Sequence, residues 1–287
     1  MGILRRGGAA LKLRKVIMQA LIYLVLAAGL FVWMFPFFWI LRTAFMTPLQ
    51  IRAFPPVWVP SPFTLRNFTE GLMILPFGRF FVNTLFIVAV NLAGVLFTST
   101  LAAYSFSRLR WPGRDMIFAI LLTAMMLPGA VTLIPVFIAW SRLGLVNTYA
   151  PLTVPAWFGG GAFFIFLLRQ FYLTIPREFD EAAIVDGAGY FRIYTSIMIP
   201  LIRPAFIAVT MFVFVNNWND FMTPLIYLSD ERLFTVSLGL RIFQGMFFTE
   251  YGFLMAAAAV STAPVVIMFL IGQRYIVEGV VMSGIKG

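Results

Sequence analysis

The side chains that could do chemistry gather in two short stretches of this 287-residue chain. The stretch 176–204 holds four of the eleven acidic residues, which are Glu178, Asp180, Glu181 and Asp186. The stretch 216–220 holds asparagines and an aspartate. The chain has no His and no Cys, which removes thiol chemistry and the usual transition-metal ligands, and the carboxylates show no catalytic pairing. We therefore expect no catalytic residue and no metal site.

The second stretch interrupts an apolar run that is long enough to cross a membrane. An ionisable side chain at membrane depth is a functional candidate, because burying it unpaired is costly. Amides such as Asn216 and Asn219 suit sugar hydroxyls, and the Trp218 ring suits the C–H faces of a sugar. The alternative, which we favour for Asp220, is a structural bond at a helix break before Pro224.

Polar residues in another apolar run could belong to the same translocation path. Asn83, Asn91 and Tyr104 are weaker candidates, since single polar residues in spans often make only interhelical hydrogen bonds. The residues that we expect to contribute to a path are Asn83, Asn91, Asn216, Trp218, Asn219 and Asp220.

The rest of the sequence is typical of an integral membrane protein. It is 61% hydrophobic and 11% charged, whereas an average soluble domain carries about a quarter charged residues. Apolar runs of about 20 residues match the thickness of a bilayer. We predict an all-α fold with one membrane domain, 16–287, after an N-terminal segment, 1–15. The six expected spans are 16–41, 80–107, 116–140, 151–174, 205–228 and 252–276.

Two of these spans contain helix breakers. Pro128 and Pro135 interrupt the third, and Gly159, Gly160 and Gly161 interrupt the fourth. Breaks inside a membrane are tolerated where protein or a wet cavity satisfies the freed backbone groups, which would indicate a translocation path. Kinks with close helix packing explain them equally well.

The basic residues indicate the orientation of the spans. With both termini inside, the cytoplasmic segments hold twice as many of the 21 Lys and Arg residues as the external ones, as the positive-inside rule requires. The stretch 176–204 is then a cytoplasmic loop and 277–287 a cytoplasmic tail. Although the net charge is +10, the basic residues form no continuous patch, so we expect no nucleic-acid partner.

The loop 176–204 has the pattern of two short helices. Apolar residues recur at helical spacing after Pro176, Gly187 and Gly189 favour a turn, and a second helix runs to Pro200. Small alanines and the aromatic ring of Phe191 suit docking into a groove of a partner. An amphipathic loop on the bilayer surface is an equally good interpretation of this pattern.

Particular motifs resemble the permeases of bacterial ABC importers. The Glu181-Ala182-Ala183 sequence with Gly187 and Ile197-Met198-Ile199-Pro200 is similar to their EAA loop. The maltose-type, carbohydrate-importing branch is resembled further by 201–204, by Trp218–Ile226, by Leu233–Val236, by Leu238–Leu240, by Gln273–Tyr275 and by the glycine-rich end, 279–287. Ile199 replaces the usual Leu, and Met282-Ser283 replaces the usual Thr-Ala-Gly pattern.

The resemblance implies a six-helix type I importer permease in the bacterial inner membrane, the shorter subunit of a pair. Its partners would be a second homologous permease, a dimer of ATPase subunits that binds ATP and Mg, an extracytoplasmic solute-binding protein and membrane lipid. This chain would bind no nucleotide and would not be an enzyme. The ATPase-coupling residues would be Glu181, Ala182, Ala183, Asp186, Gly187, Phe191 and Pro200. The tail residues near the ATPase would be Gly284, Lys286 and Gly287.

Three other functions remain open. A permease of another ABC import branch fits the EAA loop but not the stretch Trp218–Ile226 or the tail. A multispan membrane enzyme would need a convergent catalytic set. A proton-coupled secondary carrier would need intramembrane Asp, Glu or His relays, for which only Asp220 qualifies.

Overall fold

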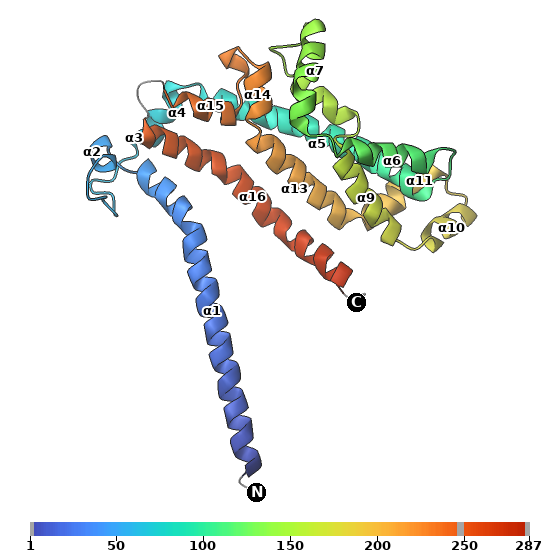
Figure 1. Ribbon diagram of the computed structural model, residues 1–287, viewed down its shortest axis with the longest axis horizontal. Coiled ribbons are helices and arrows are strands. Elements are labelled where there is room, and N and C mark those ends of the chain that lie inside the picture. The colour runs from blue at the N-terminus through green and yellow to red at the C-terminus, as the bar shows by residue number, and fades with distance from the viewer. Residues whose placement is uncertain (1–2, 246–249, 285–287) are drawn as a thin grey trace. The chain divides into compact units, whose positions relative to one another are not determined.

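The computed structural model describes residues 3–245 and 250–284, and the side chains of 14–245 and 250–274. Helices account for all the regular elements that these residues form (Figure 1). The chain forms two compact units. Unit 1 is Met1–Ile74 with Met246–Val260, and unit 2 is Leu75–Gly245 with Ser261–Gly287.

Unit 1 contains the first long helix and the polar segment that follows it. Its helices are α1 (Ile3–Ala44), α2 (Pro48–Ile51), α3 (Arg66–Thr69), α4 (Gly71–Ile74) and the first turns of α16 (Tyr251–Gly284). The segment after α1 is rich in proline, which removes backbone donors and prevents long helices. The buried Asn67 ties this segment down, because its Nδ2 donates to the carbonyls of Ala44 and Met46 at 2.9 and 2.8 Å.

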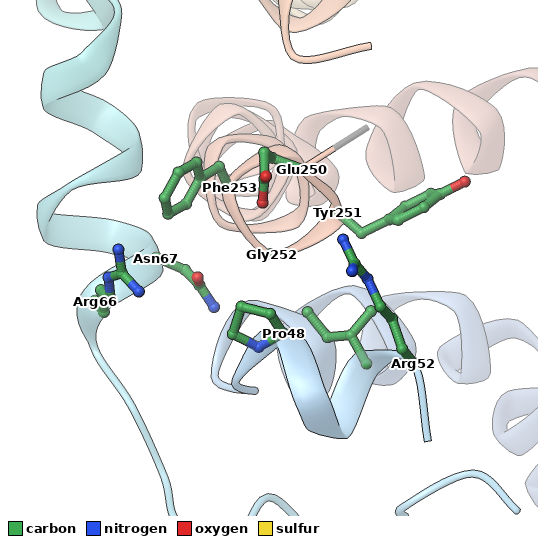
Figure 2. Close-up of a pocket in the computed structure, with 9 residues that line it drawn as sticks. Pro48, Arg52, Arg66, Asn67, Glu250, Tyr251, Gly252 and Phe253 are labelled. Atoms are coloured by element: carbon green, nitrogen blue, oxygen red, sulfur yellow. The ribbon is translucent and has the colours of Figure 1, made fainter. Parts of the chain in front are cut away.

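A hollow of about 190 Å³ lies within unit 1. It is lined by residues of α2, of α3 and of the start of α16 (Figure 2). The side chain of Arg52 extends toward Tyr251 across it, while Arg66 pairs with Glu70 at 2.6 Å. Arg52, Arg66 and Glu70 lie between the first and second expected spans, and Tyr251 lies just before the sixth.

Unit 2 is built around the long helix α5 (Phe77–Arg108). Buried residues recur along it at intervals of three or four, so one face packs inward. Against this face lie α9 (Ala162–Thr174) and α13 (Arg203–Asn219) (Figure 1). The helix α15 (Val236–Ile242) packs beside the beginning of α5. The helices α5, α9 and α13 bury one continuous apolar core, and Leu238 of α15 belongs to a second, smaller cluster with Ile87 of α5.

The third expected span, 116–140, is not one straight helix. It consists of α6 (Arg114–Ala124) and α7 (Gly129–Arg142), which meet at 98°. Pro128 explains the break, because it lacks an N–H and disfavours helical geometry at the residue before it. Pro135 was also expected to interrupt this span, but it lies inside α7, so that expectation was wrong.

The fourth expected span is broken where the glycines predict it. It begins with α8 (Ala150–Thr153) and a 3₁₀ turn (Val154–Trp157), and it resumes as α9 after Gly161. Gly160 has a φ of +58°, and a Cβ on it would lie 2.5 Å from Val95 of α5. Glycine is therefore needed here for backbone conformation and for space.

The fifth expected span, 205–228, is also divided. The helix α13 ends at Asn219, and α14 (Met222–Tyr227) follows after Asp220. The expected bond at this break is confirmed, because Asp220 Oδ1 accepts from the backbone N–H of Thr223 at 3.1 Å. A 3₁₀ turn (Glu231–Leu233) then leads to α15.

Length and composition give four spanning helices among the described residues. They are Arg14–Ala44, Phe77–Arg108, Ala150–Thr174 and Tyr251–Arg274. The count becomes six if each bent pair, Arg114–Arg142 and Tyr190–Asn219, forms one span. The protein is thus a multi-pass helical membrane protein, and the six-span arrangement is the upper count.

We expect replacement of Gly160 by Ala to destabilise unit 2. The change forces a Cβ into a positive-φ backbone and against Val95, which should lower the stability by roughly 2–4 kcal/mol. Thermal unfolding of the detergent-purified chain measures the effect. Two controls separate these effects. Gly161→Ala introduces the backbone strain, but its Cβ has no neighbour within 4 Å, and Gly129→Ala introduces neither strain nor a close contact. A melting temperature of Gly160→Ala equal to that of Gly129→Ala would contradict the packing argument.

Candidate functional site

The loop 176–204 folds as the sequence predicts, into two short helical segments around a glycine turn. The first is α10 (Glu178–Val185), with acidic residues in its first turn, where they complement the helix dipole. Gly187 follows with a φ of +80°. The second segment runs through α11 (Tyr190–Ile193), a π-helical turn (Tyr194–Met198) and α12 (Ile199–Leu201). Pro176 and Gly187 set the ends of the first helix through local backbone geometry, so the sequence alone predicts them.

One side of this loop is anchored in unit 2. Ala183, Ile193 and Met198 are buried in the core formed with α5 and α9. Ala183 was expected on the coupling surface, but the structure turns it inward. Its small side chain lets α10 approach the core closely.

The other side of the loop is exposed and largely apolar. Val185 is 87% exposed, Phe191 71%, Tyr190 63% and Ile184 50%. Glu181, Ala182, Asp186, Gly187 and Pro200, which were expected to face an ATPase, are exposed as well. A cluster of large exposed apolar side chains is typical of an interaction surface.

Arg108, the last residue of α5, holds three elements together. Its side chain is 4% exposed and donates from Nη1 to Asp180 Oδ2 of α10 at 3.0 Å. From Nη2 it donates to the carbonyls of Tyr172 and Ile175, at 2.5 and 2.7 Å. These carbonyls belong to the end of α9, where backbone acceptors have no partner inside the helix. We call this set of contacts the Arg108 brace.

The surroundings of the Asp180 carboxyl disfavour its charged form. Burial raises its pKa, and the positive charge of Arg108 opposes this shift without cancelling it. Because the folded state then binds the proton more tightly, this group stabilises the fold most below its unfolded-state pKa. Its contribution is lost as the pH rises through the folded-state pKa. At neutral pH the ion pair therefore positions α10 more than it adds stability.

Two further residues of α5 bind the second half of the loop. The Tyr104 hydroxyl donates to the carbonyl of Tyr190 at 3.2 Å. The hydroxyls of Thr100 and Tyr194 lie 2.7 Å apart in the core. Thr100, Tyr104 and Arg108 are spaced by four residues and so share one face of α5. That regular spacing is the sequence signal that could have revealed this anchoring set.

A second polar region lies at the broken part of the fourth and fifth spans. A hollow of about 430 Å³ is lined there by residues of α5, of the α8 segment, of the glycine break and of α13 and α14. We call it the polar hollow. It brings together three of the expected path residues, Asn91, Asn216 and Asp220. Asn217 and Thr223, which were not in the expected set, line it as well.

The other expected path residues point elsewhere. Trp218 is 3% exposed, and its indole N–H donates to the carbonyl of Ser261 at 2.9 Å. Asn83 Nδ2 donates to the carbonyls of Arg232 and Phe234, both at 2.9 Å. Asn219 Nδ2 bonds to the carbonyl of Val215 in its own helix at 3.0 Å. The structure therefore does not bring Trp218, Asn83 or Asn219 to the polar hollow.

Two other expectations concern metal ions and the tail. Among the described residues, no group of three or more acidic side chains is placed to hold a metal ion. Gly284 is the last residue of α16. Lys286 and Gly287 lie outside the described residues, so their expected contacts with an ATPase remain predictions.

Relatives of known name cover nearly the whole chain. The trehalose/maltose transport system permease protein MalG of Thermococcus litoralis is 33% identical over 257 residues, which is 88% of this chain and 92% of that protein. The sn-glycerol-3-phosphate transport system permease protein UgpE of Rhizobium meliloti is 32% identical over 271 residues, or 90% and 94%.

A solved structure supports the fold. A bacterial ABC transporter involved in the import of the acidic polysaccharide alginate contains a chain that matches with a TM-score of 0.81, covering 92% of this chain and 98% of that one at 21% identity. The family model described as "Binding-protein-dependent transport system inner membrane component" matches residues 94–281. This chain therefore belongs to that family, which comprises inner-membrane permeases of ABC transporters.

Proposed function

We propose that this chain is a permease subunit of an ATP-driven importer for a sugar or sugar derivative, and that the loop 176–204 couples it to an ATPase. The observation that carries the proposal is the exposed apolar side of the loop, on a segment whose other side is fixed by the Arg108 brace. Apolar side chains seated in a groove of an ATPase resist being pulled out of it. Because the Arg108 brace holds the loop, a movement of the ATPase would be passed on to α5 and α9. A loop that merely rested on a bilayer would not need such an anchor.

A carbohydrate cargo is supported by the relatives. The permeases for trehalose/maltose, for arabinooligosaccharides and for diacetylchitobiose all match most of this chain. The absence of His and Cys from the sequence agrees with a function that depends on shape and hydrogen bonding rather than on chemistry within this chain.

The transport cycle requires several partners. A second homologous permease would complete the path, a dimer of ATPase subunits would bind ATP and Mg in the cytoplasm, and a solute-binding protein would deliver the sugar outside. ATP binding would close the ATPases and draw the two coupling loops together, opening the path outward by alternating access. Both termini of this chain would be cytoplasmic, with the tail near Gly284 close to the ATPases.

Purification of a tagged copy from its native membrane tests the assembly. We expect a second permease and an ATPase in a ratio of one to two, together with ATPase activity that a loaded binding protein stimulates. Mass spectrometry identifies the chains. Recovery of this chain alone, with transport activity that needs no ATP, would instead support a secondary carrier.

We expect replacement of Val185 by Asp to release the ATPase without unfolding the membrane domain. The side chain is 87% exposed, so a charge there disturbs only a surface that a partner covers. The expected loss of bound ATPase is at least about tenfold, as for a central interface residue. The amount of ATPase that co-purifies per permease is the readout.

The matched control is Val59→Asp, the same change at a 74% exposed valine in the segment expected outside the membrane. It should retain the ATPase fully. If both variants retain it equally, Val185 does not belong to the coupling surface.

We expect Arg108→Gln to destabilise the loop and to uncouple transport from ATP hydrolysis. The change leaves Asp180 and two carbonyls without their shared cationic partner, which should cost about 2–4 kcal/mol. Thermal unfolding reports the stability, and the amount of solute imported per ATP hydrolysed reports the coupling.

Arg110→Gln is the control, because Arg110 is exposed and makes no side-chain bond among the described residues. Asp180→Asn should restore part of the stability when combined with Arg108→Gln, since it removes the unpaired carboxylate. Equal behaviour of the Arg108 and Arg110 variants would argue against the brace.

A further inference from the structure

In the expected orientation, the polar hollow lies nearer the outer face of the membrane than the loop 176–204 does. Asn91 lies just before the middle of α5, in the half away from the expected cytoplasmic end at Arg108. Asn216 lies in the last turn of α13, at its expected outer end, and Asp220 follows that helix. A solute delivered from outside would therefore meet this region before it reached the loop 176–204. The hollow, at about 430 Å³, lies within the range of small-ligand sites.

The charge of the hollow is unbalanced. Asp220 is the one ionisable side chain among the described residues that line it, and neither Lys nor Arg is among them. In partly desolvated surroundings a single carboxylate repels anions at several ångströms, because the effective dielectric constant is well below that of water. The described lining therefore lacks the Arg or Lys side chain that most often recognises a carboxylate, sulfate or phosphate.

The remaining polar groups suit hydroxyl groups. Asn216 is exposed, and Asn217 and Thr223 are partly exposed, so amide and hydroxyl groups are accessible. Each can both donate and accept, as a sugar hydroxyl does. Asn91 is 4% exposed, and its Oδ1 accepts no bond, although its Nδ2 donates to Leu152 O at 2.9 Å and to Asn217 Oδ1. A buried acceptor without a donor marks polar capacity that the chain itself does not fill.

The glycine break adds backbone groups to the same site. Gly160 and Gly161 line the hollow together with Pro155. A break of the helix at this depth frees N–H and C=O groups, which membrane proteins tolerate where the break lines a polar cavity. The break and the amides thus serve one polar site, although they come from different spans.

We propose that the polar hollow is a ligand subsite for an uncharged, hydroxyl-rich solute, and that Asp220 excludes anionic sugars from it. This inference rests on the proposed function and narrows its substrate class. The relatives alone do not decide the point, because their names include trehalose/maltose, sn-glycerol-3-phosphate and sulfoquinovosyl glycerol.

Asp220 can be tested without breaking its structural bond. Its Oδ1 accepts from Thr223 N–H at 3.1 Å, and the amide oxygen of an asparagine accepts in the same place. Asp220→Asn therefore removes the charge and keeps the hydrogen bond. Asp230→Asn is the matched control, because Asp230 likewise accepts a backbone N–H, that of Arg232 at 2.9 Å, but lies outside the hollow.

The absence of cysteine from the sequence allows a direct measurement. Asn216→Cys in the assembled transporter, in native membrane vesicles, is labelled with cationic and anionic methanethiosulfonates of similar size. We expect the cationic reagent to react faster, and the rate ratio to fall about three- to tenfold when Asp220→Asn is added. Asp230→Asn should leave the ratio unchanged. No labelling, or a ratio insensitive to Asp220, would overturn the proposal.

Protection experiments test the ligand class. Maltose, trehalose and other neutral saccharides are compared with galacturonate and sn-glycerol 3-phosphate, each presented with and without the co-purified binding protein. If neutral saccharides slow the labelling of Asn216→Cys and the anions do not, the subsite is supported. Equal or stronger protection by the anions, or none by any saccharide, would refute it. The labelling rate needs no ATP hydrolysis, so failure of the coupling proposal would show separately in the purification.

Discussion

The bonds that the buried guanidinium of Arg108 makes to α9 and α10 are the contacts on which the arrangement of the loop in unit 2 depends. It satisfies the carbonyls at the end of α9 and pairs with a carboxylate whose burial would otherwise be unfavourable. A desolvated ion pair of this kind contributes little net stability but is costly to break. Arg108 joins three places in the fold: the end of α5, the end of α9 and the first helix of the loop, α10. Arg108 therefore ties the loop to both α5 and α9.

The anchoring of the loop is distributed along one face of α5. Thr100, Tyr104 and Arg108 bind, in turn, Tyr194, Tyr190 and Asp180. The three partners follow one another in reverse order along the loop, so α5 and the loop run antiparallel where they are bonded. Their other side is left apolar and exposed. A surface held by several bonds at its back loses little entropy when a partner covers its front.

Sequence reasoning succeeded where structure is decided locally and failed where it is decided by distant contacts. The helix, turn and helix of 176–204 follow from Pro176, Gly187 and the acidic first turn, all within a few residues. The bond of Asp220 before Pro224 was predicted for the same reason. Trp218 could not be placed, because its direction is set by a carbonyl 43 residues away. Arg108 was read only as a topology signal, since its partner lies 72 residues later.

The three central helices each connect the polar hollow to the loop. On α5, Asn91 and Arg108 are separated by about 25 Å at the usual helical rise. The helix α9 begins at the glycine break and ends at the carbonyls that Arg108 binds. The helix α13 follows the loop at a 79° bend and ends at Asn219, next to Asp220. Helices are stiffer than the breaks between them, so a displacement of the loop would be taken up at breaks such as Gly160–Gly161 and Asp220, and these two breaks line the hollow.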